Sequence, residues 1–270
     1  MGEINAAITV NSLLHSPNFD LTSTYFMIAG LAGINPEVAT IGSVAFARYA
    51  VQVALQHEID VRELPGNYST GYIPIGSTSP SVYPSSIYGT EVFELNQDLQ
   101  HMAAAFARNA TLVDSPEAVA YRKNYISDLY APARGVPEIH ECDVATSDVY
   151  YSGRLLGEAF GNYTSLLTNG SGEYCTSAQE DNAVMAALIR GAASNVVDFG
   201  RIISMRSGSN FERPWVGGDA ATNLLTAVQG GFEPAVENLY HAGIKVIEGI
   251  LEGWNATFAK GVDATNYIGE

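Results

Sequence analysis

Residues 25–36 read YFMIAGLAGINP, and this stretch carries the strongest signal for the fold of the chain. The apolar and small residues of 25–29 predict a short buried strand. The glycines that follow permit a tight exit from that strand, and Pro36 discourages an immediate helix. We therefore expect a buried strand that runs into a glycine-rich loop.

Helical and strand patterns alternate on both sides of this strand. Apolar periodicity predicts helices at 4–14, 91–108, 116–125, 154–167, 181–193 and 233–258. Strand patterns occur at 43–55, 58–64, 144–151 and 201–205. This alternation predicts an α/β protein, a three-layer α/β/α sandwich with a central mixed sheet. No repeat or linker divides the chain, so we expect one domain over residues 1–270.

Three local signals refine these elements. Ser115 is expected to cap a helix that has Pro116 at its first position. Residues 65–86 are rich in Gly, Pro, Ser, Thr and Tyr, which predicts a long ordered loop over a site. The final helix carries one apolar stripe, the pattern of a helix that packs on a core. The residues of this stripe are Val236, Tyr240, Ile244, Ile247, Leu251 and Trp254.

The charge balance restricts the partners. Lysine and arginine total 13 against 29 aspartate and glutamate, a formal charge of -16, which repels nucleic acid and anionic membranes. The negative net charge does not exclude binding of one phosphate in a local pocket, because a few backbone N–H groups and one arginine can attract it at close range. No apolar stretch approaches the roughly 20 residues that a membrane-spanning helix needs. These observations favour a small-molecule partner, with neither nucleic acid nor a membrane-spanning segment.

Five Asn-x-Ser/Thr sequons favour a secreted or cell-surface protein, although no signal-peptide pattern opens the sequence. The sequon asparagines are Asn67, Asn109, Asn162, Asn169 and Asn255. In an oxidising compartment, Cys142 and Cys175 could form one disulfide; the alternative is two buried thiols that pack separately. The histidines are scattered and no metal-binding or common hydrolase motif occurs, so we expect neither a metal nor an organic cofactor.

Four sets of motifs, in this order, extend over nearly the whole chain. They are GEINAA (2–7) with IAGLAGINP (28–36); GSVAFARY (42–49) with EIDVRE (58–63) and TGY (70–72); CDVATSDVYYSG (142–153) with CTSAQEDN (175–182); and ISMRSGSNF (203–211) with QGGFEP (229–234). Together they resemble the fungal purine nucleoside permease family, which is related to purine nucleoside phosphorylases and methylthioadenosine nucleosidases. Members of that family usually carry a strand and a loop ahead of the GEIN motif, and we expect these parts to be missing from this sequence.

The resemblance implies a nucleoside phosphorylase-like fold that binds a purine nucleoside and cleaves its N-glycosidic bond. Phosphorolysis and hydrolysis both stay open, as does the base, and inorganic phosphate would be the co-substrate of the first. A non-catalytic nucleoside-binding, uptake-associated or storage protein on the same scaffold is the alternative. Related folds form homo-oligomers, and the sequence leaves the oligomeric state open.

The resemblance also assigns roles to residues in the third motif set. Tyr150 matches a position that stacks on the base, although a strand aromatic in the core would fit the same pattern. Glu180 and Asp181, next to Gln179, match an acidic segment that grips the ribose hydroxyls. An acidic helix N-terminus is the other interpretation of that segment.

The last motif set matches an Arg-x-x-Ser-Asp pattern at Arg206, Ser209 and Asn210. Its aspartate serves the purine N7, and here an asparagine takes that place. An amide donates a hydrogen bond but transfers no proton, so Asn210 indicates a 6-oxopurine preference or a weakened site; a turn residue after a strand is the remaining alternative. Ala32 and Gly33 match a loop whose backbone N–H groups contact phosphate or ribose, with Leu31 where a hydroxyl residue is often found.

Overall fold

The structure is a computed structural model that describes residues 2–270. An eight-stranded sheet with the order β6-β3-β8-β9-β1-β10-β2-β7 forms its centre, and β4 pairs with β5 in a separate hairpin. The strands are β1 Phe26–Ile34, β2 Val44–Ala47, β3 Tyr49–Gln52, β4 Gln56–Glu58, β5 Tyr72–Pro74, β6 Val92–Glu94, β7 Ile139–Glu141, β8 Asp143–Thr146, β9 Tyr174–Ala178 and β10 Ile202–Phe211.

The two longest strands lie side by side at the middle of the sheet. Strand β1 pairs with β10 in parallel, whereas β9 runs antiparallel to β1 and β2 runs antiparallel to β10. Pairings of both kinds within one sheet confirm the mixed sheet that the sequence predicted. The register between β1 and β10 shifts after Ala32, which brings Gly33 opposite Asn210.

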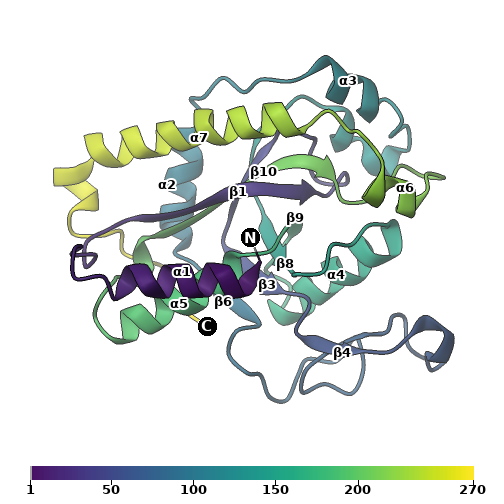
Figure 1. Cartoon of the computed structure of the whole chain (residues 1–270), viewed down its shortest axis with the longest axis horizontal. Helices are drawn as coiled ribbons and strands as arrows, with labels where there is room; N and C mark the ends of the chain where they lie inside the picture. The colour runs from purple at the N-terminus through teal and green to yellow at the C-terminus, as the bar shows by residue number, and fades with distance from the viewer. Residues whose placement is uncertain (1) are drawn as a thin grey trace.

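Helices cover both faces of this sheet, as the sandwich requires (Figure 1). The helices are α1 Glu3–Leu14, α2 Gln97–Ala107, α3 Pro116–Arg122, α4 Arg154–Leu167, α5 Asp181–Ala193, α6 Ala220–Leu225 and α7 Phe232–Glu252. Helices α1 and α5 pack together on one face, and α2 and α7 pack together on the other. Neighbouring residues of β10 divide between the two cores: Ile202 packs with Leu188 of α5, and Ile203 packs with Val246 of α7. The three-layer α/β/α arrangement is thus observed.

Helix α4 and helix α5 have the bounds that the sequence predicted, and Ser115 caps α3 through a bond from the Ala118 N–H at 3.0 Å. The helix expected over 91–108 is wrong in its first part. Strand β6 occupies 92–94, and α2 begins only behind Asn96, whose Oδ1 accepts from two backbone N–H groups at 3.0 and 3.2 Å. The cap stops the helix from extending further back.

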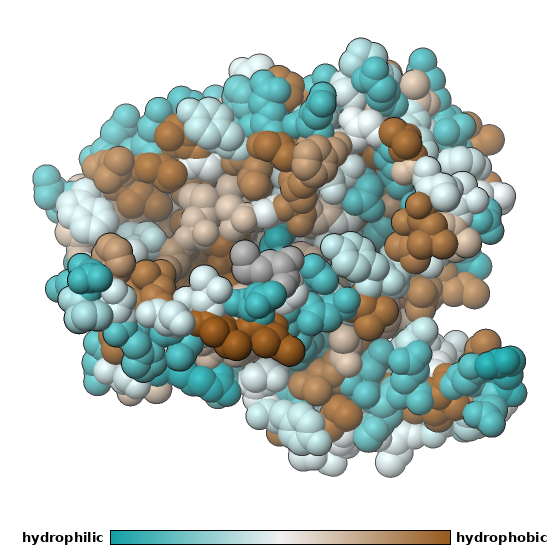
Figure 2. Space-filling model, viewed as in Figure 1, coloured by the Kyte–Doolittle hydropathy of each residue, from teal (hydrophilic) through white to brown (hydrophobic). Residues whose placement is uncertain are grey.

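Most of the apolar stripe predicted for the last helix is exposed, which corrects the prediction, although Trp254 at its end packs against the core. Val236, Tyr240 and Leu251 are 47%, 68% and 66% exposed, and Figure 2 shows brown side chains on the side of α7 that faces the viewer. The buried side of α7 instead carries small residues such as Ala242 and Gly243, which let the helix approach the sheet closely. The regular helix also ends at Glu252, before the π-helix Trp254–Phe258.

Other differences concern strands and loops. Strand β8 ends at Thr146, earlier than predicted, and β10 continues to Phe211, well past the predicted 201–205. Residues 58–64 form the end of β4 and the 3-10 helix Val61–Glu63 where strand was predicted. Strands β5, β7 and β9 and helix α6 were not predicted at all.

Cys142 and Cys175 form a disulfide, with Cα atoms 5.6 Å apart. The pairing of β8 with β9 brings them together, because Asp143 lies opposite Tyr174 and Val144 opposite Thr176. Both cysteines are buried, so the bond lies within the sheet. The alternative of two separate buried thiols is therefore wrong.

Candidate functional site

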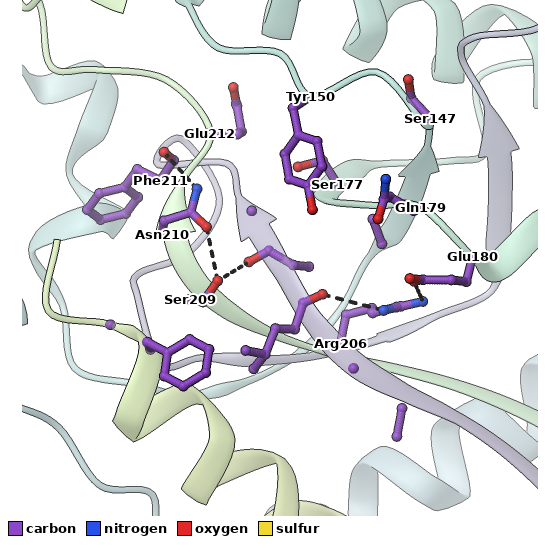
Figure 3. A pocket seen from close by; sticks show the side chains of 18 of the residues that line it. Ser147, Tyr150, Ser177, Gln179, Glu180, Arg206, Ser209, Asn210, Phe211 and Glu212 are labelled. Carbon is purple, nitrogen blue, oxygen red and sulfur yellow. Dashed lines mark hydrogen bonds and ion pairs between the residues drawn. The ribbon is translucent and has the colours of Figure 1, made fainter. Parts of the chain in front are cut away.

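A cavity of about 1380 Å³ opens at the C-terminal ends of β1 and β10, between α1, α6 and the start of α7 (Figure 3). Among the residues predicted for the site, these line it: Ala32, Gly33, Tyr150, Gln179, Glu180, Arg206, Ser209 and Asn210. They come from four segments that lie far apart in the sequence. The loop 65–86 contributes none of the lining, so its predicted position over the site is wrong.

Arg206 is the centre of a buried ion-pair group at one side of the cavity. Its Nη2 lies 2.6 Å from Asp181 Oδ2 and 3.2 Å from Glu180 Oε2, and its side chain is 5% exposed. Burial alone would lower the pKa of Arg206, but the two carboxylates outweigh it and raise the pKa. Burial raises and Arg206 lowers the pKa of Glu180, with a net lowering that keeps this carboxylate ionised.

Glu180 and Asp181 differ in position although they are neighbours. Glu180 lines the cavity, whereas Asp181 is fully buried behind it and also accepts a bond from the Ser204 hydroxyl at 2.9 Å. Asp181 is therefore placed to hold Arg206. Because it is buried behind the cavity wall, it is not placed for the direct contact with ribose that was predicted. The first turn of α5 causes the difference, because consecutive helical residues point to different sides.

The glycine-rich segment is part of the sheet. Residues 30–33 continue β1, so the predicted loop is wrong. Gly30 and Gly33 leave room for neighbouring side chains to pack against the strand. A Cβ on Gly30 would clash with Arg206 Nη1, so glycine leaves the guanidinium room to cross the strand without shifting. A Cβ on Gly33 would lie 2.5 Å from Ser177 Oγ, 3.2 Å from Glu212 Cβ and 3.7 Å from Asn210 Nδ2. Gly33 thereby lets three polar side chains converge.

Asn210 and Ser209 lie in β10, so the interpretation of Asn210 as a turn residue is wrong. The Ser209 hydroxyl lies 3.0 Å from Asn210 Oδ1 and 3.2 Å from the Ala32 carbonyl oxygen. The Asn210 amide nitrogen has one long bond, 3.4 Å to the carbonyl of Phe211, and keeps a second N–H (Figure 3). Ser209 thus fixes the amide so that its nitrogen can donate into the cavity.

Tyr150 lies at the rim, in the segment after β8, and its side chain is 75% exposed. The alternative that it is a core aromatic of a strand is therefore wrong. In Figure 3 its ring is seen between Asn210 and Gln179, on the open side of the cavity. The neighbouring Tyr151 takes the inner position, where its ring packs 4.6 Å from Phe160 and its hydroxyl lies 2.9 Å from that of Tyr174.

Glu212 is a lining residue that the sequence reasoning missed. Its side chain is 1% exposed; Oε1 accepts from Arg213 Nε at 2.5 Å, and Oε2 is buried without a hydrogen-bond partner among residues 2–270. Burial raises its pKa to about 7, against the opposing effect of Arg213. The signal that could have found it is its position two residues after Asn210, since alternate residues of an extended strand share a face.

Gln229 was also missed as a structural support of the site. Its Oε1 accepts from the Phe211 N–H at 2.7 Å, and its Nε2 donates to the Phe211 carbonyl at 3.2 Å and to Asn223 Oδ1 at 3.1 Å. Asn223 in turn donates to Ser152 Oγ at 2.9 Å. These bonds fix the end of β10, where Asn210 and Glu212 lie. The quoted QGGFEP motif contains Gln229 and carried the signal.

Within residues 2–270, no cluster of three or more His, Cys, Asp or Glu side chains could hold a metal ion. The same residues include no helix that is both long and apolar enough to cross a membrane. The acidic side chains that line the cavity are Glu117, Glu180, Glu212 and Glu233, and the basic one among the described lining residues is Arg206. The lining therefore carries an excess of negative charge.

Comparisons with known proteins extend over nearly the whole chain. The family model for purine nucleoside permease (NUP) matches residues 1–263. A purine nucleoside permease of Candida albicans is 40% identical over 275 residues, which covers 100% of this chain and 67% of that protein. A probable purine nucleoside permease of Schizosaccharomyces pombe is 41% identical over 262 residues, 94% of this chain and 74% of that protein. Among solved structures, the 5'-methylthioadenosine/S-adenosylhomocysteine nucleosidase of Neisseria meningitidis has a TM-score of 0.47 at 13% identity, covering 92% of this chain and 78% of that one.

Proposed function

The chain belongs to the purine nucleoside permease family, and from this premise we propose that it binds a purine nucleoside in the cavity at the ends of β1 and β10 and cleaves its N-glycosidic bond. The observation that carries the proposal is the convergence of Glu180 and Asn210 on one cavity. A carboxylate suits ribose hydroxyls and an amide suits a purine edge, so the two ends of one nucleoside find matching partners there.

The sugar end of the ligand is proposed to lie against Glu180. Its carboxylate accepts hydrogen bonds from ribose hydroxyls, and Arg206 keeps it ionised and in place. When the bond between C1′ and the base breaks, the sugar acquires positive charge, and a fixed carboxylate stabilises that charge. Glu180 therefore contributes more in the transition state than in the ground state, which is the condition for catalysis.

The base is proposed to lie between Tyr150 and Asn210. The exposed Tyr150 ring can pack on the face of a purine, and the Asn210 amide can donate to N7 of its edge. The same amide can donate to the O6 of guanosine or inosine, which favours 6-oxopurines. Replacing Asn210 by aspartate should therefore raise adenosine turnover and leave inosine cleavage unchanged or lower, as paired steady-state kinetics would measure. No change with either substrate would place Asn210 outside the catalytic path.

We propose water as the acceptor of the ribosyl group. Arg206 already binds two carboxylates, and four glutamates line the same cavity, so a phosphate dianion would meet repulsion there. Neutral water avoids that cost. Phosphorolysis remains the alternative outcome of the assay, because backbone N–H groups alone can hold a phosphate.

The second candidate function is nucleoside binding without cleavage, as part of uptake or storage. The observation that favours it is the asparagine at 210, because an amide cannot transfer a proton to the departing base. The relatives from Candida albicans and Schizosaccharomyces pombe are also named as permeases. Binding accompanied by no release of purine would support this alternative.

We also propose a secreted or cell-surface location. The five sequon asparagines are all exposed, and the buried disulfide is typical of oxidising compartments. Treatment of the natively expressed protein with an N-glycosidase should increase its electrophoretic mobility. Unchanged mobility, together with free thiols in the native protein, would contradict this location.

The test of the enzymatic proposal is the release of free purine from adenosine, guanosine and inosine, with and without phosphate, measured by chromatography. Glu180→Gln should reduce release about 10- to 100-fold, because a charge-assisted hydrogen bond is worth about 1.5–3 kcal/mol. Glu158→Gln is the matched control, since Glu158 also pairs with an arginine but lies exposed on α4. The enzymatic proposal fails if the wild type releases no purine from any of the three nucleosides.

A further inference from the structure

Glu212 occupies a position in the cavity that the proposed roles of Glu180 and Asn210 leave unexplained. The Glu212 N–H donates to the Ile34 carbonyl at 3.1 Å, so the extended pairing of β1 with β10 continues to this residue. Glu212 and Asn210 are two residues apart in extended chain and therefore lie on the same face. Both side chains lie beside Gly33: a Cβ built on this glycine would be 3.2 Å from Glu212 Cβ and 3.7 Å from Asn210 Nδ2.

The polar surroundings of Glu212 leave one of its oxygens unsatisfied. Arg213 bonds its Oε1 but is shared with Glu37, whose Oε1 lies 2.6 Å from Arg213 Nη1. One guanidinium thus faces two carboxylates. Oε2 is buried and has no hydrogen-bond partner in the described part of the chain, a costly arrangement that a bound ligand would relieve.

The other titratable groups around Glu212 do not supply a second positive charge. They are the hydroxyls of Tyr125, Tyr130, Tyr151 and Tyr174, whose pKa values burial raises, so they stay neutral. Burial likewise raises the pKa of Glu212 to about 7. A substantial fraction of Glu212 is then protonated at neutral pH. Because Glu212 lines the cavity, this proton is held beside the space where a ligand would bind.

On the basis of the proposed function, we propose that Glu212 is the proton donor to the departing purine. The two residues lie on one face of the extended chain at the end of β10 and have different roles: Asn210 orients the base by a neutral hydrogen bond, and Glu212 supplies the proton that an amide cannot. This role also accounts for the unpartnered Oε2, because the base nitrogen becomes its partner when the nucleoside is bound.

The step balances with water as the acceptor. The bond between C1′ and the base nitrogen breaks, and its electron pair goes to the purine, which takes the proton of Glu212. The oxygen of water forms the new bond to C1′, and the proton that this water loses returns to the Glu212 carboxylate. Ribose and free purine leave, and the enzyme regains its starting protonation state.

The test compares Glu212→Gln with Glu37→Gln on two ribosides. Glu37 is the matched control, because it bonds the same Arg213 but does not line the cavity. With inosine, Glu212→Gln should lower kcat about 100- to 10,000-fold, the usual contribution of a general acid. With 4-nitrophenyl riboside, whose phenolate leaves without a proton, the same variant should lose less than about tenfold. Glu37→Gln removes a charge that raises the pKa of Glu212, so it should lower inosine turnover at pH 7 only slightly, far less than Glu212→Gln, and leave the nitrophenyl riboside unaffected.

The wild-type pH profile provides a test that needs no variant. Glu212 must be protonated to act, so kcat/KM for inosine should fall as the pH rises above about 7, and the 4-nitrophenyl riboside should show no such fall. A flat profile for inosine between pH 6 and 9 would overturn the inference. So would equal losses of Glu212→Gln with both ribosides, which would show a structural role.

The outcomes also separate this inference from the proposed function. If the wild type releases purine and Glu212→Gln releases it equally fast, Glu212 is not the donor and the proposed function stands. If the wild type binds inosine but releases no hypoxanthine, the donor role is overturned and the binding function remains. If it neither binds nor cleaves inosine, adenosine or guanosine, the proposed function falls and the donor role with it.

Discussion

Replacing Arg206 by methionine should destabilise the protein strongly, because the residue links the core to the site. Methionine keeps much of the aliphatic stem and removes the guanidinium. Arg206 makes bonds of 2.6 and 3.3 Å to Asp181 and of 3.2 Å to Glu180, and Asp181 is fully buried. Without Arg206, the bond from Ser204 is the remaining side-chain bond that the structure shows for the Asp181 carboxylate.

The size of the effect follows from this burial. Breaking a buried ion pair by removing one partner costs about 3–5 kcal/mol, because the other charge stays in a medium that solvates it poorly. The double variant Asp181→Asn/Arg206→Met removes both charges and should cost clearly less than the sum of the single variants. We expect a coupling of about 2 kcal/mol, within the range of residues in direct contact.

Urea unfolding followed by tryptophan fluorescence measures these free energies. Arg154→Met is the control, since its pair with Glu158 is exposed and should be worth less than about 1 kcal/mol. A loss below about 1 kcal/mol for Arg206→Met, or strictly additive effects in the double variant, would refute the reasoning. Arg206→Met should also weaken nucleoside binding at least tenfold, because it releases Glu180 from its fixed position.

Three further changes test other parts of the structure. Serine at both Cys142 and Cys175 should lower the free energy of unfolding by about 3.7 kcal/mol, the chain-entropy value for a disulfide with a sequence separation of 33; an equally stable variant in urea would contradict it. Gly33→Ala should cost about 1–3 kcal/mol and weaken inosine binding at least tenfold in calorimetry, because its Cβ would lie 2.5 Å from Ser177 Oγ; unchanged affinity would argue against this part of the cavity as the site. Asp143→Asn should cost about 2–4 kcal/mol in thermal and urea unfolding, since its carboxylate accepts three backbone N–H bonds and an amide NH2 would face one of these donors; a neutral effect would contradict this.

The parts of the fold that the sequence predicted well are those with local signals. Helix α4 follows Gly153, and helix α5 has its apolar residues at regular helical spacing, so neither depends on distant contacts for its bounds. The alternation of such helices with apolar strands was enough for the α/β class. The order of the strands was beyond reach, because pairing between distant segments determines it.

The errors have physical causes that are specific to each element. The end of β10 reads SGSNF, a turn-like sequence, and it is extended because β1 pairs with it. The last helix buries Ala242 and Gly243 beside Val246 and Ile250, whereas most of the large apolar residues that periodicity assigned to the core are exposed.

For the site, the motifs identified the segments but not the depth of each side chain. Glu180 and Asp181 were given the same role, and the start of α5 separates them into a lining residue and a buried support. Glu212 was missed because residues 209–211 were not predicted as strand, so its position on the same face as Asn210 went unused; its burial and its unpartnered oxygen among the described residues became visible only in the structure. The convergence of the remaining residues around Gly33 likewise depends on the register between β1 and β10.

The measurement that tests the central claim most directly is isothermal titration of the wild type and Glu180→Gln with inosine. We expect the wild type to bind with a Kd between about 1 μM and 1 mM, the usual range for a metabolic substrate, and Glu180→Gln to bind at least tenfold more weakly. Glu158→Gln should bind like the wild type. Equal affinity of all three proteins would place the nucleoside elsewhere, and no heat of binding at several times 1 mM inosine would contradict the claim that this cavity holds a purine nucleoside.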